Sequence, residues 1–600
     1  MKTYKKIKTM KSKSIIGAAL AAIFTLGVTT SCEDMFDIDS SRVVIDKEHT
    51  LSSTADSAYT TLGILKCMQE IADRYVILGE VRGDMVEINE NTKTSLRNLA
   101  EFNFEDDNEY LDIKDYYAVI NNCNYALAKM DTTLAHNNER VMVDEYAALL
   151  GIRAWTYLQL AINYGKVPYY TNPITTVADS EKEYPMLDIK ELAAEIIPQL
   201  TPYVDYDRPV FIQDTKINKL IFPEIQLVIA DFYLWAGDYQ GAVDTYQDFL
   251  TTHKDYSYSY GDGANIETFR GYVGLNGSRL EAPRRTGAGL SSMPSSMNWY
   301  SYFSRMAGTE NLSYIPMQTS SANGTVSEIG SLFMSTDNTH ALNPSTYYAE
   351  ICGKQLYCVK PLPTGGNNTT VDKKAYTNNP LLGDQRRKWY AQERSATGEG
   401  EIGTFQYYDK LISLSMEVVG GEGTYATDQI NIYRRSIVYL RTAEALAGLY
   451  KETREPKAAE MSFNMLKDAF KVFFPDGHVM QEILQPNFIG VHARGCGDTY
   501  LDTTDYVLTP KAIALRLEKE EAAVDYNDTI DYLDELIIDE LAMEATLEGN
   551  RFGDLIRFAE RRGEPEFLAK RVASRKGSEQ MDEELYNKLL DKSLWYLPIK

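Results

Sequence analysis

The chain has 600 residues and a formal net charge of -25 at pH 7, with 86 acidic against 61 basic side chains. A chain this acidic repels nucleic-acid phosphates, and its short basic runs at 284–285, 386–388 and 561–562 are expected to be solvated or to pair with acids. Six cysteines in this length do not make a disulfide scaffold. The length suffices for a large hydrophobic core.

Residues 1–31 predict a lipoprotein signal peptide. Six lysines and no acids lie between Lys2 and Lys13, and an apolar run at 15–28 follows. This run is shorter than the ~20 residues that span a bilayer, which argues against a retained membrane helix. Small residues and then Cys32 end the segment, which resembles a bacterial lipoprotein processing site where the cysteine receives a diacylglycerol; plain secretion is the alternative. Cleavage there would change the formal charge to -31.

An acidic stretch follows the cysteine directly, at Glu33, Asp34 and Asp37. It resembles the surface-export signal of Bacteroidetes lipoproteins, and a solvated tether is the alternative. Two or more acyl chains on Cys32 would hold a folded domain firmly at a membrane. We therefore expect a lipid-anchored protein of the outer membrane, exposed at the cell surface.

Beyond residue 50 apolar residues recur at spacings of three and four, which predicts helices. One stripe occupies 113–130, and the next occupies 150–164 and ends at Gly165, with Pro168 just beyond. A third pair of helices covers 227–249 with a turn at 237–238.

A spacing of small, aromatic and apolar residues occurs twice. It is found at Ala242, Tyr246 and Phe249, and again at 459, 463 and 466. In tetratricopeptide-like units the small residue lets two helices approach and the aromatic fills the gap to the next pair. The recurrence favours a mostly α fold of stacked helical hairpins over a plain helical bundle.

Residues 251–429 lose the helical period. Eight of the 38 glycines lie between 261 and 308, and only 312–318 and 355–360 predict strands. Long loops in a compact protein are usually functional or disordered, and the aromatic content here favours function. Helical pattern resumes at Ile430 and holds to about Tyr450. We therefore divide the chain into a signal peptide at 1–31, an N-terminal helical region at 32–250, a loop-rich insertion at 251–429, and a C-terminal helical region at 430–600 that packs with the N-terminal region as one globular unit.

Four of the five cysteines other than Cys32 divide into two kinds. Cys352 and Cys358 could bridge across a short hairpin in an oxidising compartment. Cys67 and Cys123 lie on helical patterns and are expected to be small buried hydrophobes.

Enzyme motifs are weak. The six histidines are scattered and form no His-x-x-x-His pair for zinc. The segment 398–403 has the glycine spacing of a dinucleotide loop but carries two glutamates, and no Gly-x-Ser-x-Gly elbow occurs. Two carboxylates would suffice for a glycoside hydrolase, but the acids of the predicted helix at 530–541 are better explained as a solvated face; they are Asp531, Asp534, Glu535, Asp539 and Glu540. We predict a binding protein with no enzymatic activity, no cofactor and no metal site.

Four segments, in order along the chain, resemble the SusD/RagB family of outer-membrane nutrient-binding lipoproteins. They are 147–168, with Arg153-Ala154 and Val167-Pro168; 435–446, with Val438-Tyr439-Leu440-Arg441 and Ala443-Glu444-Ala445; 540–557, with Glu548-Gly549-Asn550-Arg551 and Asp554-Leu555-Ile556-Arg557; and Leu597-Pro598-Ile599 near the end. The resemblance implies tetratricopeptide-like units that support a loop-rich binding face. It also implies a SusC-like TonB-dependent transporter as partner, and capture of an oligosaccharide. The alternative is a RagB-like surface protein that binds peptide or host matrix without a glycan role.

A sugar site needs flat aromatic platforms beside hydrogen-bonding side chains. Trp299, Tyr300, Tyr302 and Phe303 cluster inside the glycine-rich insertion, and Trp389-Tyr390 follow a basic triplet. These aromatics are our candidate platforms, and the alternative is that they fix the insertion to the scaffold. A second candidate region, suggested by the family resemblance, contains Arg82, Asp84 and Asn89.

Overall fold

A computed structural model gives the fold of the chain from Leu51 to Ile599. The described residues are 51, 53–137, 139–213, 216–252, 311–318, 325–334, 338–355, 358–359, 384, 386–387, 391–395, 404–408, 416–419, 422–425, 427, 429–468, 491–494, 500–501 and 506–599. Contacts join the residues from Leu51 onward into one compact unit. The signal segment, Cys32 and the acids that follow it lie outside the described residues.

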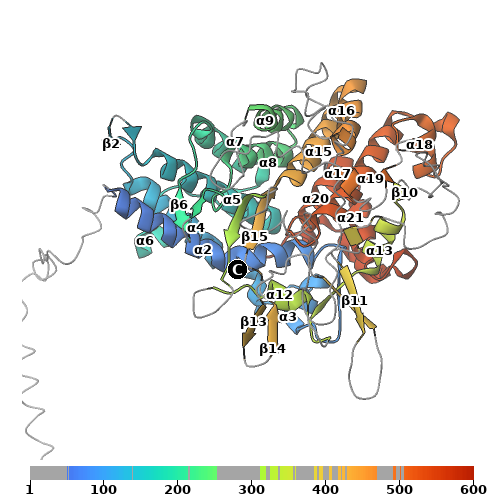
Figure 1. The fold of residues 1–600 in the computed structure, drawn as a ribbon, viewed down its shortest axis with the longest axis horizontal. Coiled ribbons are helices and arrows are strands. Elements are labelled where there is room, and N and C mark those ends of the chain that lie inside the picture. Colours follow the sequence, from blue (N-terminus) through green and yellow to red (C-terminus); the bar gives the residue numbers. More distant parts are fainter. Residues whose placement is uncertain are drawn as a thin grey trace, which may run out of the picture. The chain divides into compact units, whose positions relative to one another are not determined.

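Long helices pack in the order in which they occur along the chain. They are α2 (Thr54–Glu80), α4 (Lys114–Lys129), α5 (Val143–Tyr164), α7 (Ile189–Leu200), α8 (Ile225–Ala236), α9 (Tyr239–Thr252), α15 (Arg435–Thr453) and α16 (Pro456–Asp468). Helix α4 packs on α2, α5 on α4, α7 on α5, α8 on α7 and α9 on α8; α15 then packs on α9, and α16 on α15. Contacts between successive hairpins are typical of a helical-repeat scaffold, so the predicted fold class is confirmed (Figure 1).

The C-terminal helices close the structure back onto its beginning. They are α17 (Val491–Arg494), α18 (Pro510–Arg516), α19 (Tyr526–Ala545), α20 (Arg551–Arg562), α21 (Pro565–Ala573) and α22 (Glu583–Leu589). Helix α19 packs on α15 and α20, and α20 also packs on α2. The first and last parts of the unit therefore share one core.

Local sequence signals explain several helix ends. Helix α5 ends at Gly165, as predicted, and this glycine has φ +74°. Helix α8 ends at Gly237 in the left-handed conformation. Helix α7 begins with a capping box. The side chain of Asp188 accepts from the backbone N–H of Glu191, and the side chain of Glu191 accepts from the backbone N–H of Asp188.

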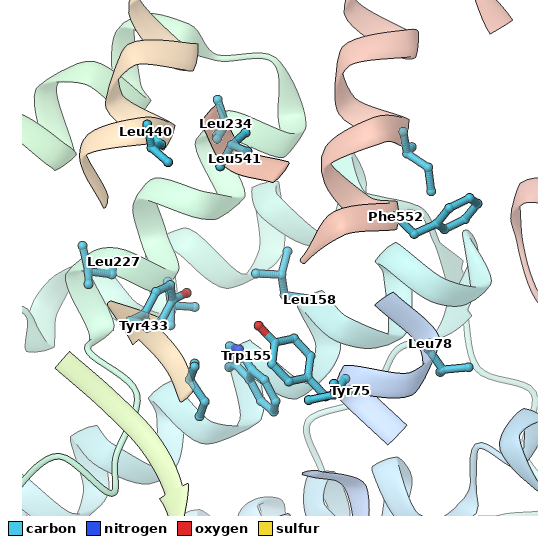
Figure 2. Packing of buried hydrophobic residues seen from close by; sticks show 14 of the residues in the cluster. Tyr75, Leu78, Trp155, Leu158, Leu227, Leu234, Tyr433, Leu440, Leu541 and Phe552 are labelled. Carbon is cyan, nitrogen blue, oxygen red and sulfur yellow. The ribbon is translucent and has the colours of Figure 1, made fainter. Parts of the chain in front are cut away.

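The repeated spacing read from the sequence serves the helical contacts. Its six residues are all buried: Ala242, Tyr246, Phe249, Ala459, Phe463 and Leu466. Gly448 adds a closer approach between α9 and α15, because a Cβ there would lie 2.4 Å from the ring of Tyr239. Figure 2 shows part of the core, where Tyr75 of α2, Trp155 of α5 and Tyr433 converge.

Short two-stranded antiparallel sheets accompany the helices. Those in the loop-rich region and beside it are β1 (Val86–Ile88) with β9 (Leu342–Pro344), β8 (Asn311–Pro316) with β15 (Gln429–Arg434), β10 (Cys358–Val359) with β16 (Tyr500–Leu501), β11 (Ala391–Ser395) with β12 (Thr404–Tyr408), and β13 (Met416–Val419) with β14 (Glu422–Tyr425). Those between the N-terminal helices are β2 (Ala135–His136) with β3 (Glu139–Arg140), β4 (Val167–Pro168) with β5 (Met186–Leu187), and β6 (Phe211–Gln213) with β7 (Lys216–Asn218).

Short helical elements complete the fold. They are α3 (Thr94–Ala100), α6 (Val177–Ser180), α12 (Ile329–Phe333) and α13 (Thr346–Gly353), with single 3₁₀ turns at Glu109–Leu111, Thr201–Tyr203, Glu521–Ala523, Ser578–Gln580 and Lys592–Trp595. In Figure 1, α3, α12 and the β13–β14 hairpin lie along the lower edge, and α7, α9 and α16 lie along the upper edge.

Two sequence predictions in and beside the loop-rich region need correction. The predicted strand at 312–318 corresponds to β8, and β10 lies within the one predicted at 355–360, of which only 355, 358 and 359 are described. The hairpins β11–β12 and β13–β14 were not predicted. The helix does not begin at Ile430, because residues 429–434 form β15, whose six side chains are all buried. The β-branched and aromatic residues Ile430, Ile432 and Tyr433 favour such a strand, and a segment of six residues is too short to separate a period of two from one of 3.6.

The cysteines follow the sequence only in part. Cys123 is fully buried, as expected, and Cys67 is half-buried. Cys352 is buried with a free thiol, so the bridge to Cys358 is not formed. Burial also raises the pKa of the Cys352 thiol well above its usual range. Over the described part of the chain, no helix is both long and apolar enough to cross a membrane.

Candidate functional site

The structure describes three of the ligand residues suggested by the sequence. Arg82, Asp84 and Asn89 follow helix α2. The aromatic candidates lie outside the described residues; they are Trp299, Tyr300, Tyr302, Phe303, Trp389 and Tyr390. The glycine-spaced segment 398–403 lies outside them too.

Arg82 is fully buried and belongs to the scaffold. Its Nε donates to the carbonyl oxygen of Leu78 at 2.9 Å and its Nη1 to that of Trp595 at 3.0 Å. Nη2 donates to the side chain of Asn163, and the guanidinium lies 4.4 Å from the ring centroid of Phe552. Burial lowers the pKa of Arg82. These contacts join α2, α5 and the C-terminal segment, and they leave no exposed surface on Arg82 for a ligand.

Asp84 is also fully buried. Its two carboxylate oxygens accept from Nε and Nη2 of Arg551, at 2.5 and 2.7 Å. This bidentate pair ties the segment after α2 to the start of α20, and it raises the pKa of Arg551. The structure therefore places Arg82 and Asp84 inside the scaffold, and only Asn89 of this trio reaches the surface.

Asn89 belongs to a group of asparagine side chains and backbone carbonyls that we call the amide cluster. Strand β1 pairs with β9 through Ile88 opposite Leu342, so Asn89, just after β1, faces the residues just before β9. Strand β12 packs on β9 and adds a further residue. The cluster comprises the side chains of Asn89, Asn91 and Asn343 and the backbone carbonyls of Asn338 and Gln406, arranged around His340.

Asn89 is the central link of the amide cluster. Its Nδ2 donates to the carbonyl oxygen of His340 at 3.0 Å and to Oδ1 of Asn343 at 3.1 Å. Its Oδ1 accepts from the backbone N–H of Asn91 at 2.9 Å. Asn91 in turn donates from Nδ2 to the carbonyl oxygens of Asn338 at 2.8 Å and His340 at 3.3 Å.

His340 ties the cluster to the β11–β12 hairpin. The side chain is 1% exposed. Its Nε2 lies 2.8 Å from Oδ1 of Asn343 and 2.9 Å from the carbonyl oxygen of Gln406. A carbonyl oxygen can only accept, so Nε2 carries a hydrogen in this arrangement.

Helix α12, which precedes the cluster residues 338–343, is fastened to α2. The carboxylate of Asp73 accepts from the hydroxyl of Ser327 at 2.5 Å and from the backbone N–H of Glu328 at 2.6 Å. Tyr110 donates to Glu328 at 2.8 Å. Burial raises the pKa of Asp73 to about 6, against the opposing effect of these two hydrogen bonds.

The acids of α19 are not the solvated face expected from the sequence. Asp534, Asp539 and Glu540 are buried. Glu540 lies 2.6 Å from Nη1 of Arg386, and Glu535 lies 2.7 Å from Nη2 of Arg571. Arg561 pairs with Asp534 and Arg516 with Asp539. The prediction failed because the spacing of acids along a helix does not show whether arginines of other elements will bury them.

The family-like segments supply a second set of buried ion pairs. Arg441 of α15 pairs with Asp231 of α8 and donates to the side chain of Asn550 at 2.8 Å. Arg557 of α20 forms a bidentate pair with Glu444 of α15, at 2.9 and 2.8 Å. These segments therefore supply contacts between the helices of the scaffold.

A polar cavity lies among these ion pairs. It is lined by Arg82, Asn163, Asp231, Arg441, Asn550 and Arg557 and has a volume of about 20 Å³. A single water needs about 10 to 15 Å³ on this measure, so the cavity is too small for a sugar ring.

The amide cluster offers neutral hydrogen-bond donors and acceptors, which suit hydroxyl and amide groups of a ligand. Within the described ranges no group of three or more His, Cys, Asp or Glu side chains could hold a metal ion. The sequence did not reveal Asn91, Asn338, His340, Asn343 or Gln406 as site residues. For all but Gln406 the only signal is the density of asparagine at 89–91 and 338–343, two segments that the pairing of β1 with β9 brings together.

The geometry first defines a class, a helical-repeat scaffold that carries a polar, loop-rich face. No protein-family model and no curated protein sequence matches the chain. Solved structures match it over most of its length. A SusD superfamily protein from Bacteroides vulgatus ATCC 8482 has a TM-score of 0.53 at 13% identity, covering 92% of this chain and 96% of that one.

Two structures from Bacteroides fragilis NCTC 9343 agree. A SusD superfamily protein has a TM-score of 0.52 at 16% identity, covering 91% of this chain and 96% of that one. A SusD-like carbohydrate-binding protein has a TM-score of 0.51 at 14% identity, covering 87% of this chain and 88% of that one. The chain has the SusD fold, which confirms at the level of fold the resemblance read from the four sequence segments.

Proposed function

We propose that the mature chain is a cell-surface glycan-binding lipoprotein that captures an oligosaccharide and delivers it to a SusC-like TonB-dependent transporter of the outer membrane. The observation that carries the proposal is the SusD fold, which the chain shares with a SusD-like carbohydrate-binding protein over 87% of its length. The amide cluster supports it, because neutral donors and acceptors suit sugar hydroxyls.

Anchoring belongs to the same proposal. The lysine-rich, apolar start and Cys32 support a lipid anchor, and Glu33, Asp34 and Asp37 support export to the cell surface. Binding then requires no chemical step. The protein would hold the oligosaccharide at the entrance of the transporter, and energy for uptake would come from the inner membrane.

The aromatic residues of the loop-rich region complete the proposed site. Trp299, Tyr300, Tyr302 and Trp389 would stack on the apolar faces of sugar rings, while the amide cluster with Asn89 would bond their hydroxyls. The aromatic residues and residues 338–343 lie in the chain between α9 and α15, and Asn89 and Asn91 follow β1, which pairs with β9 of that region.

Calorimetric titration of the mature chain with neutral oligosaccharides tests the proposal. Suitable probes are heptasaccharides of α-1,4-glucan, β-1,3-glucan, β-1,4-xylan and β-1,4-mannan, with a tryptic peptide pool from casein as the competing ligand class. We expect saturable binding of at least one oligosaccharide. Binding of the peptides alone would contradict the glycan role.

A further inference from the structure

We infer that the amide cluster presents one fixed donor, Nδ2 of Asn343, and one fixed acceptor, Oδ1 of Asn91, to hydroxyl groups of a neutral sugar, and that His340 is the positioning residue for that donor. The inference rests on the proposed function and deepens it, because it assigns the polar contacts of the site.

The orientation of Asn343 follows from groups whose hydrogen-bonding roles are unambiguous. Asn89 points Nδ2 at the backbone carbonyl of His340, so the same Nδ2 meets an oxygen on Asn343, at 3.1 Å. Nε2 of His340 must carry its hydrogen to serve the backbone carbonyl of Gln406, so it cannot accept from Asn343, and its single N–H is shared with an oxygen of Asn343 at 2.8 Å. Two donors thus fix Oδ1 of Asn343 inward, and its Nδ2 faces away from both.

The outward Nδ2 of Asn343 is available to a ligand. Asn343 is half-buried, and no acceptor for its Nδ2 occurs among the residues that the structure describes. An amide whose oxygen already holds two donors loses little freedom when a ligand binds its nitrogen, which lowers the entropic cost of binding.

Asn91 supplies the opposite polarity. Its Nδ2 faces two backbone carbonyls, those of Asn338 and His340, so its orientation is also unambiguous. The side chain is exposed, and in the described part of the chain nothing donates to its Oδ1. Asn89 connects Asn91 to Asn343, so the donor and the acceptor belong to one hydrogen-bonded unit.

This pair selects a ligand class. A sugar hydroxyl can donate and accept, so it can satisfy either group by rotating its hydrogen. A carboxylate or phosphate accepts only and would meet the lone pairs of Oδ1 of Asn91. The pair therefore favours neutral hydroxylated ligands over anionic ones.

His340 acts through Asn343 and does not touch the ligand. At 1% exposure its ring is closed off from solvent, and its Nε2 spans Asn343 and the β12 backbone. Without that donor, only Asn89 would hold the amide of Asn343, and the direction of the amide would be less defined.

Asn343→Asp is the decisive variant, because it keeps the shape and Oδ1 while replacing the donor by an oxygen. We expect the full mature chain to bind the best of the four heptasaccharides about tenfold more weakly, as for one lost hydrogen bond, with an unchanged melting temperature. Asn587→Asp is the matched control, since Asn587 is exposed on α22 and, among the described residues, its side chain bonds only the carbonyl oxygen of Glu583 on its own helix. The control should bind as the wild type does.

A double-mutant cycle separates positioning from folding. His340→Leu should weaken binding several-fold in the wild-type background and add nothing in the Asn343→Asp background, whereas His340→Gln, whose amide nitrogen can replace Nε2, should restore binding. Equal losses in both backgrounds would overturn the positioning role.

The outcomes distinguish this inference from the proposed function. If the wild type binds an oligosaccharide and Asn343→Asp binds it equally, the inference is wrong and the glycan role stands. If no heptasaccharide binds, the proposed glycan-binding function is wrong, and the inference that rests on it is wrong as well. If the casein peptides bind and Asn343→Asp weakens them, the pair serves a peptide backbone and the sugar assignment is overturned.

Discussion

Buried arginines that donate to backbone carbonyl oxygens connect the C-terminal segment to helix α2 and the residues that follow it. Arg575 donates to the carbonyl oxygens of Gly83, Ala100 and Val81, at 2.7, 2.7 and 2.9 Å, and Arg82 donates to that of Trp595. Each guanidinium is buried and donates to more than one backbone carbonyl oxygen. Removing one leaves these acceptors unpaired, which costs more than the net value of the bonds.

Arg575→Met should therefore destabilise the protein by about 3 kcal/mol, because three buried carbonyls lose their donor while the apolar stem is kept. Urea unfolding followed by circular dichroism measures the change. Arg140→Met, at an exposed position, is the control and should leave the free energy of unfolding within about 0.5 kcal/mol of the wild type. Equal midpoints for the two variants would refute the role of Arg575.

Asp73 should make stability depend on pH. Its pKa is raised from 3.8 to about 6, so the folded state binds the proton more tightly than the unfolded state does. The stabilisation from this proton is complete below about pH 4 and is lost as the pH rises through 6. Asp73→Asn cannot ionise, so its melting temperature relative to the wild type should increase between pH 4 and pH 7, by the equivalent of about 1 to 2 kcal/mol. A constant difference across this range would contradict the raised pKa.

The loop tryptophans give a test of ligand stacking. Trp299→Ala or Trp389→Ala should weaken oligosaccharide binding by roughly 1 to 3 kcal/mol, the value of one lost stacking platform, with little change in melting temperature. Trp155→Ala is the contrasting variant, because this indole is 1% exposed in the core and its loss should cost about 3 to 5 kcal/mol of stability. Normal binding with a lowered melting temperature would assign the loop tryptophans to the scaffold.

At the scale of elements, the periodicity of apolar residues predicted the long helices, but it did not predict most of the short strands. The stripes of α4, α5, α8 and α9 are long enough for their spacing to be read. Strand β15 was mistaken for the start of α15, because its partner β8 lies more than a hundred residues earlier. The same limit hid the pairing of β1 with β9, and with it most of the amide cluster.

Helix α2 allows a matched test of close packing. A Cβ at Gly79 would lie 2.0 Å from the carbonyl oxygen of Gly549, a backbone atom that cannot move aside cheaply. Gly79→Ala should lower the free energy of unfolding by at least about 2 kcal/mol through overpacking. Gly63→Ala on the same helix meets no atom within 4 Å and should raise it by up to about 1 kcal/mol through helix propensity. Thermal melts of the two variants should shift in opposite directions.

At the scale of the whole molecule, the sequence reveals the scaffold more readily than the site. The recognisable segments contain Arg441, Glu444, Arg551 and Arg557, which form buried pairs between helices. Such pairs can be recognised because the fold requires them, whatever ligand is bound. The amide cluster depends on which loops meet in space, so the family-like segments do not contain it.

Replacing Cys32 by Ala tests the attachment of the whole molecule. The variant should be folded, since the described unit begins at Leu51, but it should no longer partition with membranes or incorporate labelled palmitate. Membrane fractionation of the wild type and the variant measures the effect. Unchanged partition of the variant would refute the lipid anchor.

The closure of the C-terminal segment onto α2 governs when the protein can fold. Arg82 and Trp595 are 513 positions apart, and Asp84 and Arg551 are 467 apart. Contacts of such long sequence separation form late and slow folding. If the chain is exported as proposed, helix α2 would leave a translocation channel long before its partners are on the same side. The chain would then cross the membrane before its native core can form, and a molecule truncated near its C-terminus would lack the residues that pack on α2.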